Sequence, residues 1–137
     1  MHTTPWFAIN AALPPGKNLW SLVFLLFSTI CWKSSGSEQY LSAAIPLALI
    51  VNELITNAYK HAFTNKKEGA IEILLVENNK QIFLTIKDNG QGFDKTVIPK
   101  NSIGMDILAG LIEQINGICN LTSDEKGTQY KISFSKK

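Results

Sequence analysis

The sequence lacks the features that would place it within a membrane or on nucleic acid. Its longest apolar run, residues 19–32, has 14 residues, whereas a membrane-spanning helix needs about 20. Only Lys17 and His2 precede this run as basic residues and no A-x-A site follows it, so the sequence supports a secretion signal only weakly. A buried helix or strand is favoured over membrane insertion. Lys and Arg (13) nearly balance Asp and Glu (11), and we expect no nucleic-acid partner.

Cysteine is scarce as well. Cys31 and Cys119 are the only two, and their spacing matches neither a CxxC motif nor a zinc site. A single disulfide between them is one interpretation. The favoured one is two small buried apolar residues in a reducing compartment.

Residues 1–37 differ from the rest of the chain. They contain no acidic residue, and the run Pro14-Pro15-Gly16 interrupts them. We therefore divide the chain into an atypical N-terminal segment, residues 1–37, which holds the apolar run, and a domain over residues 38–137.

The pattern after residue 38 is that of an α+β domain. Pro46 suits the first turn of a helix, and residues 46–63 carry an apolar face at helical spacing: Leu47, Ile50, Val51, Leu54, Ile55, Ala58 and Ala62. Two hairpins of β-rich runs are predicted, 70–76 with 81–87 and 118–123 with 128–134. Residues 102–116 predict a helix between them, with Gly117 as its C-terminal cap and one apolar face: Ile103, Ile107, Leu108, Leu111, Ile112 and Ile115. This order predicts a sandwich in which helices cover one face of a mixed or antiparallel sheet.

A polar stripe follows the other face of the first helix. Glu53, Asn57, Lys60, His61 and Thr64 recur at steps of three and four. An ordinary solvated face is the simplest interpretation. However, a carboxylate and an amide one turn apart, followed by a cation, also form an oxygen-donor set for Mg²⁺ with a phosphate neighbour.

Asp88 directly follows the strand 81–87, and Gly90 and Gly92 come next. A carboxylate at a strand end can accept a hydrogen bond from an exocyclic amine, and the glycines let the backbone approach a flat ring. The DxGxG pattern is common in turns, so it is a weak signal alone. Its spacing is that of neither a P-loop nor a dinucleotide-binding fingerprint.

The string SIGM, residues 102–105, opens the second predicted helix. Backbone N–H groups at a helix start favour phosphate oxygens, and Gly104 permits a close approach. A serine N-cap beside an incidental glycine is the alternative. Gly92 and Gly104 also flank a loop that suits a movable lid.

The order of these motifs along the chain is more specific than any one of them. NELxxNAxKH, DNGxGF, SxGM and Gly127-Thr128 resemble the N, G1 and G2 boxes and the GT element of the GHKL ATP-binding superfamily. Over residues 40–135 the sequence is most similar to the catalytic ATP-binding domain of bacterial sensor histidine kinases, of the type with a HisKA_2 dimerisation domain. The resemblance implies the Bergerat fold, a two-layer α/β sandwich with a mixed sheet and helices on one face.

The resemblance also implies a role for each matched residue. Asn57 corresponds to the Mg²⁺ ligand, Glu53 to the residue that orients the attacking group, and Lys60 to the phosphate contact, with His61 beside it at the nucleotide edge. Asp88 corresponds to the residue that accepts a hydrogen bond from the adenine amine, and Gly90 and Gly92 to the turn beside adenine. Gly104 corresponds to the helix start beside the phosphates, and Thr128 to the threonine beneath adenine.

The resemblance implies partners too. They are ATP and Mg²⁺, a phosphoacceptor dimerisation domain in the parent kinase, and a downstream response regulator. We expect a cytoplasmic location, with membrane association only through residues 19–32 or a missing region. His2 and His61 lie in no acceptor helix, and residues 1–37 resemble neither the dimerisation helices nor the strand that leads into the N box. We therefore expect a catalytic domain without its phosphoacceptor.

Two alternatives stay open. One is a switch kinase of the anti-sigma type, which phosphorylates Ser or Thr on a small protein. The other is a nucleotide-binding module that transfers no phosphate.

Overall fold

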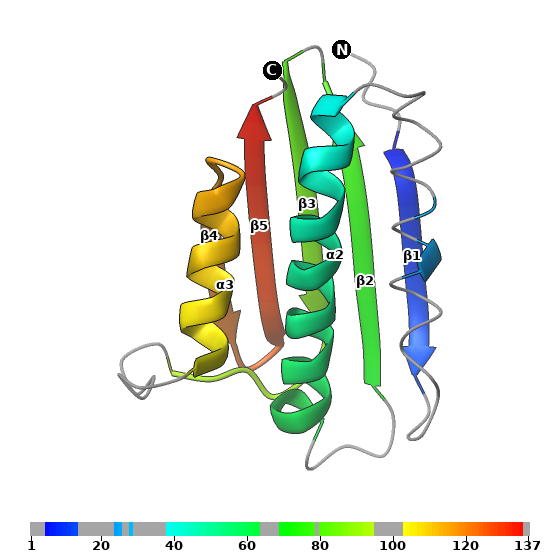
Figure 1. Cartoon of the computed structure of the whole chain (residues 1–137). Helices are drawn as coiled ribbons and strands as arrows, with labels where there is room; N and C mark the ends of the chain where they lie inside the picture. The colour runs from blue at the N-terminus through cyan, green and yellow to red at the C-terminus, as the bar shows by residue number, and fades with distance from the viewer. Residues whose placement is uncertain are drawn as a thin grey trace.

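The computed structural model describes residues 5–13, 24–25, 28, 38–63, 69–78, 80–94 and 103–135. Five strands form one sheet in the order β1-β2-β3-β5-β4, and two helices lie on the same face of it (Figure 1). The elements are β1 (Pro5–Leu13), α2 (Glu38–Asn57), the π-helical turn η1 (Ala58–Ala62), β2 (Gly69–Glu77), β3 (Gln81–Asp88), α3 (Ile103–Gln114), β4 (Ile118–Asp124) and β5 (Gly127–Ser135). Within the described ranges, no helix combines the length and the apolar character that a bilayer crossing requires.

The α+β class and the two-layer arrangement with helices on one face are confirmed. The sheet itself is antiparallel rather than mixed, since each of the four strand pairs in the described part of the chain runs antiparallel. The tight turns of the β2–β3 and β4–β5 hairpins reverse the chain direction. The outer pair β1–β2 and the central pair β3–β5, which no tight turn joins, are antiparallel as well.

Strand β1 was not predicted. It lies within the N-terminal segment that the sequence sets apart, and it pairs along its length with β2, with an irregularity between Pro5 and Phe7. Proline at the first residue of an edge strand removes no hydrogen bond that the sheet needs. Of the apolar run 19–32 the structure describes residues 24, 25 and 28, where Phe24 and Leu25 are exposed, contrary to the buried placement expected for the run. The rest of the run, Cys31 included, lies outside the described residues. The boundary at residue 38 stays a prediction.

Helix α2 and the turn η1 pack the predicted apolar face on the sheet. All seven predicted residues of that face are buried, against strand residues such as Ile73, Leu84 and Ile132 in the same core. The predicted start was wrong, because α2 begins at Glu38 and Pro46 lies inside it. An interior proline disfavours a helix by about 3 kcal/mol. The buried face extends upstream to Ala44, and this packing offsets the loss.

Helix α3 confirms only part of its predicted apolar face. Leu108 is buried, and Leu111, Ile112 and Ile115 pack against the core, but Ile103 and Ile107 are exposed. Its C-terminal cap is also shifted by one residue. Asn116 takes the left-handed conformation (φ 52°), and the N–H groups of Asn116 and Gly117 donate to the carbonyls of Glu113 and Ile112 at 2.9 Å each. This is the Schellman pattern, in which Gly117 is the second residue beyond the cap.

Candidate functional site

The predicted motifs meet at one end of the sandwich. At the lower end of Figure 1, α2 and η1 finish, β3 ends, α3 begins and the β4–β5 turn lies. Segments that are far apart in the sequence therefore supply one site.

The α2 side of this site holds two oxygen donors. Glu53 and Asn57 are half-buried, one helical turn apart. A Cβ atom on Gly104, in the first turn of α3, would collide with Glu53 Oε1 and lie 4.0 Å from Asn57 Oδ1. A carboxylate and an amide oxygen therefore converge on the start of α3, where backbone N–H groups favour anions. Gly104 leaves this space open, because a side chain at this position would displace the Glu53 carboxylate.

The end of this helix departs from the predicted α-helical stripe. Ala58–Ala62 form a π-helical turn, and Lys60 and His61 within it are exposed. A π turn is wider than an α turn and is common at functional sites. Lys60 and His61 therefore continue at the site end of α2, but not at the strict α-helical positions that the spacing predicted.

Gln91 caps this π turn, and it was not among the predicted site residues because it stands at the variable position of DNGxGF. Its backbone N–H donates to the Ala62 carbonyl at 3.0 Å, and its side-chain amide donates to the His61 carbonyl at 2.8 Å. Carbonyls at a helix end lack partners within the helix. Gln91 therefore ties the loop after β3 to the helix that carries Glu53 and Asn57.

Asp88 and Thr128 form the floor of the site on neighbouring strands. Both are polar residues buried in the helix-facing layer. Asp88 Oδ1 accepts hydrogen bonds from Gly90 N–H at 2.9 Å and from Thr128 N–H at 3.2 Å. These two bonds fix the orientation of the carboxylate, since bonds from N–H groups stabilise a buried carboxylate.

Ser123 is a second residue that sequence reasoning missed. It lies opposite Thr128 in the β4–β5 register, and its hydroxyl is 2.8 Å from Thr128 Oγ1. It also accepts a hydrogen bond from Phe93 N–H at 2.8 Å. The available signal was the alternation of β4, which places position 123 on the helix-facing side, but the residue type alone indicates no role.

The two glycines of the turn after β3 have different reasons to be glycine. Gly90 is buried against Ala62, where a Cβ would collide with the Ala62 side chain. Gly92 has a φ of 69°, and a Cβ there would collide with the Asp124 carbonyl. A left-handed conformation with no room for a side chain strongly favours glycine. The turn is thus held close to both η1 and β4.

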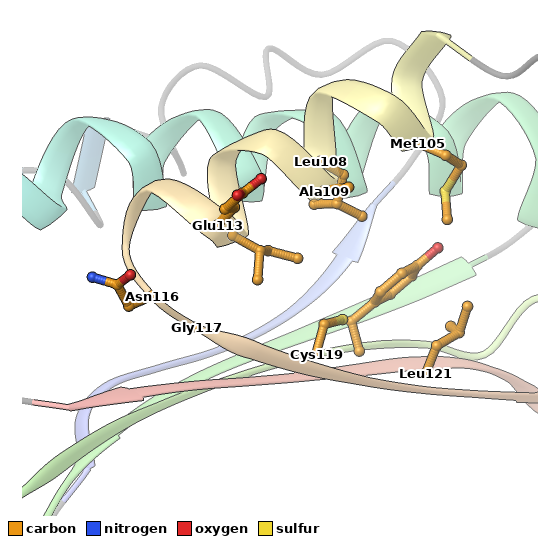
Figure 2. A pocket seen from close by; sticks show the side chains of 10 residues that line it. Met105, Leu108, Ala109, Glu113, Asn116, Gly117, Cys119 and Leu121 are labelled. Atoms are coloured by element: carbon orange, nitrogen blue, oxygen red, sulfur yellow. The ribbon is translucent and has the colours of Figure 1, made fainter.

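A pocket adjoins the site between α3 and the strands β4 and β5. Its volume is about 630 Å³, and Met105, Leu108, Ala109, Cys119 and Leu121 give it a mainly apolar lining (Figure 2). Burial raises the pKa of Cys119. Burial, with Cys119 and Asp88 nearby, also raises the pKa of Tyr130, another lining residue, to about 12. Both groups are therefore neutral at physiological pH.

The structure brings together Glu53, Asn57 and Gly104 on the helix side, and Asp88, Gly90, Gly92 and Thr128 on the strand side. Most of the predicted lid, residues 95–102, lies outside the described residues. The same is true of Thr64 and His2.

A family model for histidine kinase-, DNA gyrase B- and HSP90-like ATPases matches residues 42–137. The chain belongs to this ATPase family. The match covers most of the chain, includes every motif of the site and implies that the domain binds ATP. The GHKL resemblance is thereby confirmed.

The relatives of this ATPase domain include sensor kinases. Nitrate/nitrite sensor protein NarX of Escherichia coli (strain K12) is 30% identical over 92 residues, which cover 66% of this chain and 15% of NarX. Sensor histidine kinase YdfH of Bacillus subtilis (strain 168) is 36% identical over 88 residues, which cover 61% of this chain and 21% of YdfH. The chain therefore spans only a small part of the length of these relatives.

Solved structures agree on the fold. The histidine kinase domain of the Erythrobacter litoralis EL346 blue-light-activated histidine kinase matches with a TM-score of 0.66 at 22% identity. The match covers 85% of this chain and 64% of that one. At this identity the likeness establishes the shared fold, and the residue roles rest on the site itself.

Proposed function

We propose that this ATPase domain is the ATP-binding catalytic part of a cytoplasmic sensor histidine kinase. It would hold Mg-ATP and supply the γ-phosphoryl group to a histidine on a separate dimerisation domain, with a response regulator downstream. The observation that carries the proposal is the pairing of two subsites at one end of the fold. A buried acceptor, Asp88, lies on the strand side, and a carboxylate and an amide face the start of α3 on the helix side.

The residues present fit a magnesium ion. In the described ranges no group of three or more His, Cys, Asp and Glu side chains could hold a metal ion, so an all-protein cage is not formed there. Mg²⁺ needs only one or two protein oxygens when substrate phosphates and water complete its shell. Asn57 Oδ1 is such an oxygen, and it lies 4.0 Å from the position of a Cβ on Gly104, with Glu53 Oε1 beside the same position. The ion would neutralise charge on the transferred phosphoryl group.

The remaining functions are base recognition, phosphate binding and orientation of the attacking group, and residues of the chain supply each of them. The Asp88 carboxylate receives the amine of adenine. The N–H groups at the start of α3 bind phosphate oxygens, which Gly104 allows to approach. Exposed Lys60, at the end of the same helix as Asn57, contacts the phosphates. Glu53 orients the imidazole that attacks the γ-phosphorus, as the bond to the bridging oxygen breaks and ADP leaves.

Calorimetric titration of the 137-residue chain with a non-hydrolysable ATP analogue, with and without Mg²⁺, tests the binding step. We expect Mg²⁺ to strengthen binding in the wild type, and Asn57→Ala to remove that gain while circular dichroism stays unchanged. Asn52→Ala is the matched control, because Asn52 is a half-buried asparagine on another face of α2. A variant Asn57→Ala that unfolds would show that Asn57 is structural and contradict its assignment to the metal.

Transfer is tested with γ-labelled ATP and a purified dimerisation domain from a histidine kinase relative. We expect acid-labile label on the added domain and little on the isolated chain. Stoichiometric phosphohistidine at His61 or His2 of the isolated chain would contradict the proposal. Acid-stable label on Ser or Thr of a small protein would favour the switch-kinase alternative, and tight binding without any transfer would favour the binding module.

A further inference from the structure

Ser123 lies where it can control the chemistry of Thr128. The helix-facing residues Thr128 of β5 and Ser123 of β4 are opposite one another in the strand register. On the other side of Thr128, β3 contributes Asp88, whose carboxylate accepts the Thr128 N–H. Three polar side chains from three adjacent strands therefore form one row beneath the base-side turn.

The hydrogen bonds of this row have a direction. Phe93 N–H can only donate, so Ser123 Oγ accepts from it at 2.8 Å. Thr128 Oγ1, at 2.8 Å, is the other partner of Ser123 within the described part of the chain. The arrangement that satisfies the Ser123 proton is the one in which Ser123 donates to Thr128 Oγ1. Thr128 then uses an oxygen lone pair for Ser123 and keeps its own proton for a ligand.

We propose that Ser123 is a positioning residue for base selection: by donating to Thr128, it makes Thr128 a hydrogen-bond donor beside the acceptor Asp88. This inference rests on the proposed function, because it assumes that the site binds a purine nucleotide. An acceptor beside a donor matches the edge of adenine, which presents the N6 amine and the N1 acceptor. Hypoxanthine and guanine present O6 and N1–H at the same places, so both contacts are mismatched.

The test compares ATP with inosine triphosphate, whose base has O6 and N1–H but no 2-amino group. Affinities for both nucleotides are measured calorimetrically on the whole chain. Ser123→Ala frees the Thr128 hydroxyl to rotate and accept from N1–H. We therefore expect the ATP affinity to fall about fivefold to tenfold, as on loss of one net hydrogen bond, while the inosine triphosphate affinity stays constant or rises. Ser123→Thr, which keeps the hydroxyl, should restore the wild-type preference.

A matched control is Thr122→Ala on the exposed, opposite face of the same strand, which should change neither affinity. Equal weakening of both nucleotides in Ser123→Ala would overturn the inference, because a merely structural role lowers both together. An unchanged preference would overturn it as well. If Ser123→Ala does not fold, Thr128→Val tests the donor that Ser123 is proposed to orient: the preference for ATP must fall when this hydroxyl is removed, and an unchanged preference would overturn the inference. Failure of the wild-type chain to bind either nucleotide would overturn the proposed function, and this inference with it.

Discussion

Replacement of either of two glycines of α3 by alanine separates an effect on nucleotide binding from an effect on stability. Gly104 lies in the first turn of the helix, where an added Cβ would collide with Glu53 Oε1. Gly110 lies six residues later on the same helix, and nothing lies within 4 Å of an added Cβ. Alanine at the two positions therefore changes helix propensity in both cases but enters the candidate site in only one.

The expected magnitudes differ accordingly. Glycine inside a helix is about 1 kcal/mol less favourable than alanine, so Gly110→Ala should raise the melting temperature by about 4 °C for a domain of this size. At Gly104 the gain is smaller, because the first turn is only partly hydrogen-bonded. The colliding atom is the end of a flexible side chain, which can rotate away, so we expect a melting temperature within about 2 °C of the wild type.

Nucleotide binding should respond in the opposite way. A methyl group at position 104 displaces the Glu53 carboxylate and keeps phosphate oxygens away from the N–H groups of α3. Loss of one hydrogen bond to a charged group is worth about 1.5–3 kcal/mol, so we expect the ATP affinity of Gly104→Ala to fall at least about tenfold. Gly110→Ala should bind ATP as the wild type does.

Thermal unfolding followed by circular dichroism and calorimetric titration with ATP measure the two properties. Wild-type affinity in Gly104→Ala would refute the assignment of the α3 start to the phosphates. A loss of stability in Gly110→Ala would refute the helical environment of that residue. Equal loss of affinity in both variants would show that α3 affects binding only through its general stability.

Three further changes test other parts of the structure. Asp88→Asn should weaken ATP binding and narrow the preference for ATP over GTP, because an amide can donate to the guanine carbonyl; calorimetry with both nucleotides measures this, and an unchanged preference would contradict the role of Asp88. The Tyr59 hydroxyl is buried and finds no hydrogen-bond partner among the described residues, and burial raises the pKa of this residue. Tyr59→Phe should therefore stabilise the fold by about 1 kcal/mol, as measured by urea unfolding, and a large destabilisation would reveal a partner for the hydroxyl. The pKa of Tyr130 is raised to about 12, so the unfolded chain loses this proton near pH 10 while the folded chain still holds it. Stability should be unaffected below pH 10 and fall between about pH 10 and 12, and Tyr130→Phe should reduce that fall in unfolding experiments across this range.

Local patterns predicted much of the fold. The hairpins β2–β3 and β4–β5 lie within two residues of their predicted bounds, because alternation of side chains and turn residues are short-range signals. The buried face of α2 was predicted for the same reason. Strand β1 was missed because its pairing with β2 is a long-range contact, and residues 5–13 carry no turn motif that leads into β2.

The incorrect predictions for the two helices have a different physical cause. Helix α3 is apolar on more than one face, so its periodicity could not decide between Ile103 and Ile107, which are exposed, and Leu108, which is buried. The start of α2 depended on whether packing could offset an interior proline, which is a tertiary effect. The π turn at Ala58–Ala62 likewise has its terminal carbonyls capped by Gln91, some thirty residues away in the chain.

The same distinction separates the predicted site residues from the missed ones. Asp88, Asn57 and Gly104 belong to short motifs, so each could be found from its neighbours in the sequence. Gln91 and Ser123 act through hydrogen bonds that join distant segments: η1 to the loop after β3, and that loop to β4. Together these bonds hold the loop after β3 against both η1 and β4. The proposed base recognition would therefore depend on Gln91, at the variable position of DNGxGF, and on Ser123, outside every motif. Their hydrogen bonds join distant segments and so align the residues that the motifs specify.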